Sequence, residues 1–343
     1  MIISTHKKIA LISVILLTIL FTTLLKAEDS MLTKKPYFTY RIETKGALYE
    51  AKINGILLEK DTRGNALNFE QPVNQYMRTG KNRIHFNLYS RSLEDFNEAN
   101  ITISLFVNQD EASETQKKLI SQITFKASDF AKEKAPQQGI QASMPALKLD
   151  STNNFIAADD GDVIVHVAQI ELSKVRPKHG YHIYQDIELY TPFPEWGFFN
   201  ADKLDFPDAW SDFQSNIEHY RQTITTPLYQ EHQKLFELLK TENVDKILPL
   251  FAERNREYDT ALYYPEGTYN EKLRKALQSD FDDENSVLKI DAIDYAAPAI
   301  SDDKKLIRVG APEMIYFENE EHSIFSKYPI WFYKKDGKWI ISR

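Results

Sequence analysis

The sequence predicts a two-part protein in which an all-β sandwich is followed by an α+β domain. Apolar and polar residues alternate with period two from about residue 36 to 190, helical spacing begins near residue 227, and short strands return after residue 287. Strands first, then helices with an antiparallel sheet, indicate separate units and not an alternating α/β fold. A chain of 343 residues with 42% hydrophobic residues can bury two cores without disulfides, and it contains no cysteine. We divide it into residues 1–27, 36–190, 191–226 and 227–343.

Residues 1–27 have the pattern of a secretory signal peptide. His6, Lys7 and Lys8 form a basic start, Ile9–Leu25 carries no charge, and Ala27 suits a cleavage site. At about 1.5 Å per residue the uncharged run spans about 26 Å, just short of a bilayer core. We predict a cleaved signal; an uncleaved signal anchor is the alternative and the only membrane contact expected.

The net charge of the chain indicates which type of partner it can bind, and its lack of cysteine indicates the compartment in which it works. Without the signal, 39 Lys and Arg (42 less Lys7, Lys8 and Lys26) face 50 Asp and Glu, a net charge of −11. The sequence has no basic patch for a polyanion, which argues against nucleic acid. A cysteine-free exported chain favours the periplasm of a Gram-negative envelope. The acidity suits a basic protein partner, or solubility alone.

The first domain is predicted from its strands. Ile84–Leu88 and Ile101–Asn108 alternate, so each is a strand with one buried face. Asn54-Gly55 between apolar flanks predicts a tight hairpin. Further strands are predicted at Leu119–Phe125, Val163–Leu172 and Tyr181–Tyr190, with a short helix at Ser128–Lys134 and a long loop or domain break over Glu133–Asp162.

Residues 191–226 form a connector rich in proline and aromatic residues. Pro192, Pro194 and Pro207 lie among Trp196 and Trp210 and several phenylalanines. Because the segment is so rich in aromatic residues, we predict that it packs between the two domains. This packing would explain both tryptophans without a role in binding.

The last domain is predicted to open with helices and close with strands. Leu228–Leu239 and Val244–Phe251 have helical spacing, with Thr241-Glu242-Asn243 as a break, and Glu271–Gln278 is a third helix. Strands are predicted at Val287–Ile293, Leu306–Val309, Met314–Phe317, Ile324–Tyr333 and Trp339–Ser342, with Asp336-Gly337 as a hairpin turn.

Two stretches of this domain carry a family resemblance. Leu235–Leu248 reads as helix, short break and helix, and Pro329–Ile341 reads as strand, Asp-Gly-Lys-Trp and strand. Residues 227–343 thus resemble the nuclear transport factor 2-like fold, also called SnoaL-type or cystatin-like. The resemblance implies a cone-shaped α+β domain in a superfamily that includes small-molecule isomerases and hydratases, and also immunity proteins against bacterial toxins.

A weaker resemblance lies in the first domain. Ala51–Leu58, with its Asn-Gly hairpin, and Gly80–Phe86, with its Gly-x-Asn turn, are similar to the galactose-binding-like jelly roll that accompanies large glycosidases. Only this span matches, so sugar binding is not carried over.

Candidate functional residues lie where the cone would open. Catalysis there needs a carboxylate or histidine in the pocket and a group that polarises a carbonyl. Tyr258, Asp259, Tyr263 and Tyr264 are the candidates, and the structural alternative is a solvated helix end with aromatics covering the cone. Together with Trp196 and Trp210 they are predicted binding residues; no catalytic residue is predicted.

No metal or cofactor is predicted. His179 and His182 flank a glycine turn and are expected to be exposed, and His322 lies in an acidic turn. The calcium-like stretch from Asp280 has Asn285 where Gly is needed and Asp291 where Glu is needed. No phosphate loop or GxSxG elbow is present.

These observations favour a non-enzymatic periplasmic protein that binds another macromolecule, such as an immunity protein that neutralises a basic antibacterial effector. Two alternatives stay open: an isomerase-like enzyme or small-molecule binder with a pocket in the last domain, and a glycan-binding envelope protein. Distant residues can assemble a catalytic set in any fold, so the sequence leaves catalysis open although no motif calls for it.

Overall fold

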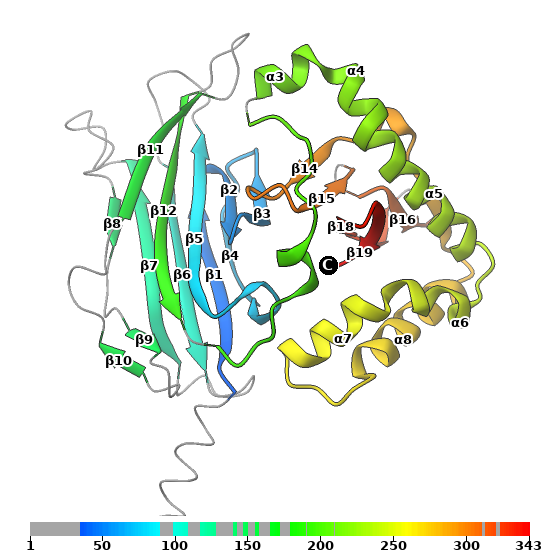
Figure 1. Cartoon of the computed structure of the whole chain (residues 1–343), viewed down its shortest axis with the longest axis horizontal. Coiled ribbons are helices and arrows are strands. Elements are labelled where there is room, and N and C mark those ends of the chain that lie inside the picture. The colour runs from blue at the N-terminus through cyan, green and yellow to red at the C-terminus, as the bar shows by residue number, and fades with distance from the viewer. Residues whose placement is uncertain are drawn as a thin grey trace, which may run out of the picture.

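The computed structural model describes residues 35–89, 99–108, 117–127, 140–142, 147–149, 155–157, 165–171, 179–189, 191–208, 210–310, 313–319 and 323–343. An N-terminal region built from strands lies beside a C-terminal region of helices and strands (Figure 1). We call residues 35–189 the β region and residues 210–343 the mixed region. The predicted signal peptide, residues 1–27, and the helix predicted at Ser128–Lys134 lie outside the described residues.

The β region contains two five-stranded antiparallel sheets. The first has the order β4-β1-β6-β7-β8, with β4 at Leu67–Pro72, β1 at Tyr37–Lys45, β6 at Asn100–Asn108, β7 at Lys118–Lys126 and β8 at Ile140–Ala142. The second has the order β11-β12-β5-β2-β3, with β11 at Val165–Glu171, β12 at His179–Leu189, β5 at Gly80–Tyr89, β2 at Leu48–Ile53 and β3 at Ile56–Asp61. Two short strands, β9 at Leu147–Leu149 and β10 at Phe155–Ala157, pair with each other inside the segment predicted as a loop or break.

The alternation in the sequence explains the core of this region. Ile42 and Ile103 from the first sheet, and Ile84 and Phe86 from the second, are fully buried in one shared hydrophobic cluster. The predicted hairpin joins β2 to β3, and Asn54 and Gly55 have φ values of 49° and 80°. The strands predicted in the first domain are present.

The connector is half irregular and half helical. A 3-10 turn, η5 at Gly197–Asn200, is followed by α3 at Trp210–Ser215, α4 at Ile217–Tyr220, a π-helical turn, η6, at Arg221–Thr225, and α5 at Thr226–Leu239. The helices before residue 226 were not predicted. They are stabilised by stacked rings from the connector itself, since Phe213 stacks on Phe206 at 5.2 Å and on Tyr220 at 5.7 Å.

The mixed region places helices against two small antiparallel sheets. After α5 come α6 at Val244–Ile247, the 3-10 turn η7 at Leu248–Phe251, α7 at Ala252–Ala261 and α8 at Thr268–Asp282. One sheet has the order β13-β16-β17, with bounds Val287–Ile290, Ile315–Glu318 and Ile324–Lys327. The other has the order β14-β15-β18-β19, with bounds Pro298–Ile300, Leu306–Val309, Phe332–Lys335 and Lys338–Ile341. A second hydrophobic cluster, which includes Leu235, Ile247 and Phe332, fills the space between helices and strands.

Two predicted strands are wrong in extent. The strand predicted at Val287–Ile293 ends at Ile290, and a 3-10 turn, η8 at Ile293–Tyr295, follows. The strand predicted at Ile324–Tyr333 is two strands in different sheets, β17 and β18. Pro329 lies between them, where it lacks the N–H that a continuous ladder needs. No helix in the described part of the chain is long and apolar enough to cross a membrane.

Candidate functional site

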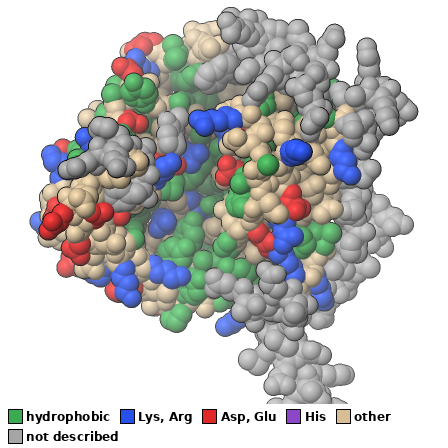
Figure 2. All heavy atoms as spheres, turned by 180° about the vertical axis from the view of Figure 1, so that it is seen from behind, with side chains coloured by type: hydrophobic (Ala, Val, Ile, Leu, Met, Phe, Trp, Pro, Cys, Tyr) green, Lys and Arg blue, Asp and Glu red, His purple; other side chains and the backbone are tan. Residues whose placement is uncertain are grey.

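The two regions meet around the side chain of Arg343, which is only 3% exposed. Its Nη2 donates a hydrogen bond of 2.7 Å to the Gln75 carbonyl, in the 3-10 turn η1 (Asn74–Tyr76), and its Nη1 pairs with Glu257 of α7. The guanidinium also lies 4.6 Å from the ring centroid of Phe198 in η5. One cation thus joins the β region, the connector and the mixed region. From behind, apolar side chains show along the seam between the two regions (Figure 2).

Asn74 and Tyr263 make further bonds across this junction. Asn74 is fully buried; its Oδ1 accepts from the Phe38 N–H at 2.6 Å, and its Nδ2 donates to the Ala261 carbonyl at 2.7 Å. Tyr263 donates from its hydroxyl to the Pro36 carbonyl at 3.0 Å. The end of α7 is therefore bound to the β region by buried hydrogen bonds, which are costly to break.

Tyr258 and Tyr264, predicted as binding residues, are half-buried and pack against the hydrophobic cluster that contains the core of the β region. Tyr258 stacks on Tyr269 of α8 with centroids 4.6 Å apart and lies under the guanidinium of Arg254. Tyr264 lies 6.3 Å from the same Tyr269 ring, and Lys272 Nζ is 4.0 Å from its centroid. These rings hold α7 against α8.

Asp259 has a structural role that its position in the sequence does not reveal. It is 4% exposed, and its two oxygens accept from the backbone N–H groups of Gly267 and Tyr269, both at 2.8 Å. The carboxylate therefore caps the N-terminus of α8, where a negative charge is stabilised by unpaired N–H groups.

The two tryptophans of the connector lie in different elements. Trp196 is 1% exposed, and its Nε1 donates to the Met77 carbonyl of the β region at 2.8 Å. Trp196 thus lies at the interface between the connector and the β region, in line with the prediction that the aromatic connector is packed. Trp210 begins α3, but its side chain lies outside the described residues.

Gly197 allows the connector to approach α7 closely. Its N–H donates to Glu257 Oε1 at 2.7 Å, and a Cβ on this residue would lie 2.6 Å from Glu253 Oε1 and 2.9 Å from the Tyr333 hydroxyl. Tyr333 in turn donates to Glu253, and burial together with this bond raises the pKa of the Tyr333 hydroxyl. Glu253 and Glu257 therefore satisfy groups of the junction.

A cluster that the sequence did not reveal lies on the outer face of the second sheet. Lys52 of β2, His85 of β5 and His182 of β12 gather there, and Asp302 reaches them from the mixed region. His182 was expected at an exposed turn, but it lies within β12 and is half-buried. In the sequence, Lys52 and His85 occupy polar positions of the alternating pattern. This pattern predicts that they lie on the solvent-facing side of the sheet, and it does not indicate that they form a cluster.

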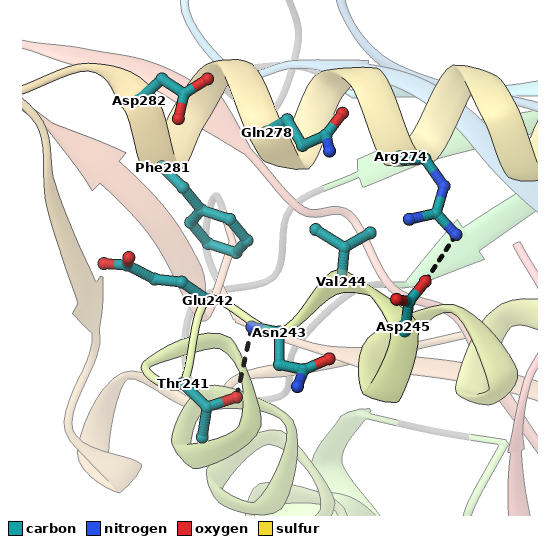
Figure 3. A pocket seen from close by; sticks show the side chains of 9 residues that line it. All are labelled: Thr241, Glu242, Asn243, Val244, Asp245, Arg274, Gln278, Phe281 and Asp282. Carbon is teal, nitrogen blue, oxygen red and sulfur yellow. Dashed lines mark hydrogen bonds and ion pairs between the residues drawn. The ribbon is translucent and has the colours of Figure 1, made fainter.

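The open surface of the mixed region has a polar depression of about 480 Å³ at the ends of its helices (Figure 3). It is lined by the turn after α5, the start of α6 and the last turns of α8: Thr241, Glu242, Asn243, Val244, Asp245, Arg274, Gln278, Phe281 and Asp282. Val244 and Phe281 supply its apolar surface. The lining contains three carboxylates, from Glu242, Asp245 and Asp282, and one guanidinium, from Arg274, so it has a net charge of −2. Arg274 pairs with Asp245 at 2.7 Å.

Nothing in the described residues groups three potential metal ligands. In the calcium-like stretch, Asp280 accepts from Ser326 Oγ at 2.8 Å and from the Tyr328 hydroxyl at 2.5 Å, and Asp283 accepts from the Asn285 N–H at 3.0 Å. These carboxylates close local turns and hold α8 to the sheet. His322 lies outside the described residues.

Comparison with known proteins found no matching family model, no matching curated protein and no matching solved structure. The resemblances to the nuclear transport factor 2-like and galactose-binding-like folds stay predictions. Two features of the described residues are candidates for function: the junction around Arg343, whose Nη1 and Nη2 are hydrogen-bonded, and the open acidic depression of the mixed region.

Proposed function

We propose that the protein is a non-enzymatic envelope protein that binds another protein, with the acidic depression as its contact surface. The observation that carries the proposal is the depression itself, with its exposed carboxylates around the apolar Val244 and Phe281. A basic side chain of a partner would find charge complementarity and an apolar wall there.

The geometry of the junction supports a binder over an enzyme. Asp259 accepts two backbone hydrogen bonds, and Tyr263 bonds to the backbone of the β region. A catalytic carboxylate must be available to a substrate proton, which these bonded oxygens are not. The paired junction instead holds both regions as one preorganised surface, and this lowers the entropy cost of binding.

Within this class we propose an immunity protein of the periplasm that neutralises a basic antibacterial effector. The proposal rests on the predicted export signal, the net charge of −11 without it, and the proposed nuclear transport factor 2-like character of the mixed region and sandwich character of the β region. Acidic residues at the contact surface would steer a basic effector and cover its cleft.

Co-expression with the exported toxin encoded beside its gene tests this proposal. Wild-type protein is expected to protect the cells and to co-purify with the toxin, and the Glu242→Lys/Asp282→Lys variant is expected to lose both. A matched variant, Glu188→Lys/Glu195→Lys, makes the same charge change at exposed sites away from the depression and should protect fully. Equal protection by both variants would remove the depression from the contact. If no gene beside it encodes a toxin and purification from the host yields no protein partner, the binding function itself is wrong.

A further inference from the structure

Two acids that line the depression of the mixed region are not used by the fold. Within the described residues, the carboxylates of Glu242 and Asp282 make no hydrogen bond or ion pair, and both residues are exposed. Other acids nearby are engaged, since Asp245 pairs with Arg274 at 2.7 Å and Asp280 accepts from two side-chain hydroxyls on and just after β17. The charges of Glu242 and Asp282 are therefore available to a ligand.

Glu242 also has a backbone conformation that its side chain disfavours. Its φ of 53° lies in the left-handed region, just after the end of α5, where glycine is the usual residue. Tyr263 has a similar φ of 58°, and its hydroxyl donates to the Pro36 carbonyl at 3.0 Å. Lys304 has a φ of 61°, and it pairs with Asp208 at 2.6 Å. Within the described residues, the side chain of Glu242 makes no such bond that would offset the strain.

The helices around the depression favour a cation there. Both α5, which ends at Leu239, and α8, which ends at Asp282, point their carboxyl ends at it. The carboxyl end of a helix carries a partial negative charge, which stabilises a cation and destabilises an anion. Asp282 in the last turn of α8 thus lowers the stability of its own helix. A bound cation would be stabilised by both helix ends and by both acids.

An aromatic ring adjoins the two acids. Phe281 precedes Asp282 at the end of α8 and lines the depression together with Val244 (Figure 3). The ring is held from the other side by Phe317 of β16, with the two centroids 6.1 Å apart in an edge-on arrangement. The depression therefore combines an ordered ring with two uncompensated carboxylates.

We propose that the depression binds an arginine side chain of the partner, with the guanidinium on the ring of Phe281 and against Glu242 and Asp282. This inference rests on the proposed function and names the group that its contact surface recognises. A guanidinium is planar and weakly hydrated, so it stacks on a ring while its N–H groups donate in its plane to carboxylates. A lysine ammonium is compact and strongly hydrated, and it gains less from the ring.

Three capped tripeptides test the proposal: Gly-Arg-Gly, Gly-Lys-Gly and Gly-citrulline-Gly, in which citrulline is the neutral isostere of arginine. Binding is followed by the NMR amide shifts of residues 241–245 and 278–282 at physiological ionic strength. The arginine peptide is expected to shift them saturably, with a dissociation constant at least threefold below that of the lysine peptide, and the citrulline peptide to leave them unchanged. No saturable shift with the arginine peptide, equal affinity for lysine, or saturable binding of citrulline would each overturn the proposal.

Variants separate the two carboxylates from the general negative charge of the chain. Glu242→Gln and Asp282→Asn are each expected to raise the dissociation constant of the arginine peptide at least threefold. Glu188→Gln is the matched control, because Glu188 is an exposed carboxylate of β12 outside the depression, and its loss should leave the affinity unchanged. Equal weakening in all three variants would reduce the effect to net charge and contradict the proposal.

The stability of the variants distinguishes a binding role from a structural one. Glu242→Gly relieves the left-handed strain, and Asp282→Asn removes a negative charge from the carboxyl end of α8. Both variants are expected to raise the midpoint of urea unfolding while they weaken binding of the arginine peptide. A lower midpoint in either variant would show that the acid serves the fold, against the proposal.

Failure of this inference can be told apart from failure of the proposed function. If the co-expressed toxin binds and the arginine peptide does not, the arginine site is wrong and the binding function stands. If the arginine peptide binds as expected and no protein partner is found, the site stands and the proposed function is wrong.

Discussion

The two ends of the mixed region differ in what their polar groups do. At the end that faces the β region, Arg343 and Asp259 are buried, Glu257 is partly buried, and all three are bonded to backbone or to each other. At the other end, where the turn between α5 and α6 lies near the end of α8, Glu242 and Asp282 are exposed around an open depression. Similar side chains thus stabilise the protein at one end and are available to a partner at the other. Substitutions at the two ends are therefore expected to affect stability and binding differently.

The largest effect is expected at Arg343. Arg343→Leu leaves Glu257 without its cation and the Gln75 carbonyl without its donor, so the free energy of unfolding should fall by about 3–5 kcal/mol. Urea denaturation measures it. Arg343→Lys retains the charge but not the two-pronged geometry, and should lose less. A loss below about 1 kcal/mol in Arg343→Leu would mean that the junction does not stabilise the protein.

An asparagine at each end gives a matched pair. Asn74→Ala leaves the buried Phe38 N–H and Ala261 carbonyl unpaired, and should cost about 2–3 kcal/mol. Asn243→Ala removes only the exposed cap of α6, where Oδ1 accepts from the Lys246 N–H at 3.2 Å, and should cost about 1 kcal/mol. Equal losses in thermal or urea unfolding would contradict the contrast between the ends.

A smaller effect is expected at Gly197. Gly197→Ala places a Cβ against Glu253 and Tyr333, whose side chains can shift slightly, so we expect a loss of about 1–2 kcal/mol. A matched glycine, Gly267, has open space within 4 Å of the position that a Cβ would take, and differs in having a positive φ of 88°. In Gly267→Ala the loss should come from backbone strain alone, about 1 kcal/mol, with no change in the environment of Trp196. Tryptophan fluorescence distinguishes the two, because only Gly197 lies beside Trp196.

The smallest effect on stability is expected at the open end. Glu242→Lys/Asp282→Lys alters exposed side chains and should change the free energy of unfolding by less than about 0.5 kcal/mol. Its effect is expected on partner binding, measured by calorimetry with the purified partner. A large loss of stability would show that these carboxylates are part of the fold.

The strands and helices were largely predictable because periodicity is a local signal. Ile84–Leu88 alternates and lies in β5, and Leu228–Leu239 has helical spacing and lies in α5. The junction was not predictable, since Asn74 contacts Ala261 and Lys52 contacts Asp302 across 187 and 250 residues. Neighbouring residues say nothing about such partners. For the same reason, the sequence analysis placed Asp259 in a pocket, whereas its carboxylate caps α8.

The same separations govern how the protein acquires its structure. Arg343 bonds to Gln75 over 268 residues, so this contact closes a very long loop, and its entropy cost is met only when both ends are already ordered. We therefore expect each region to form its own core early and the junction to form last. During synthesis, the rings of Trp196 and Phe198 lack their contact with the Arg343 guanidinium until residue 343 has emerged, and apolar surface exposed in that interval favours aggregation.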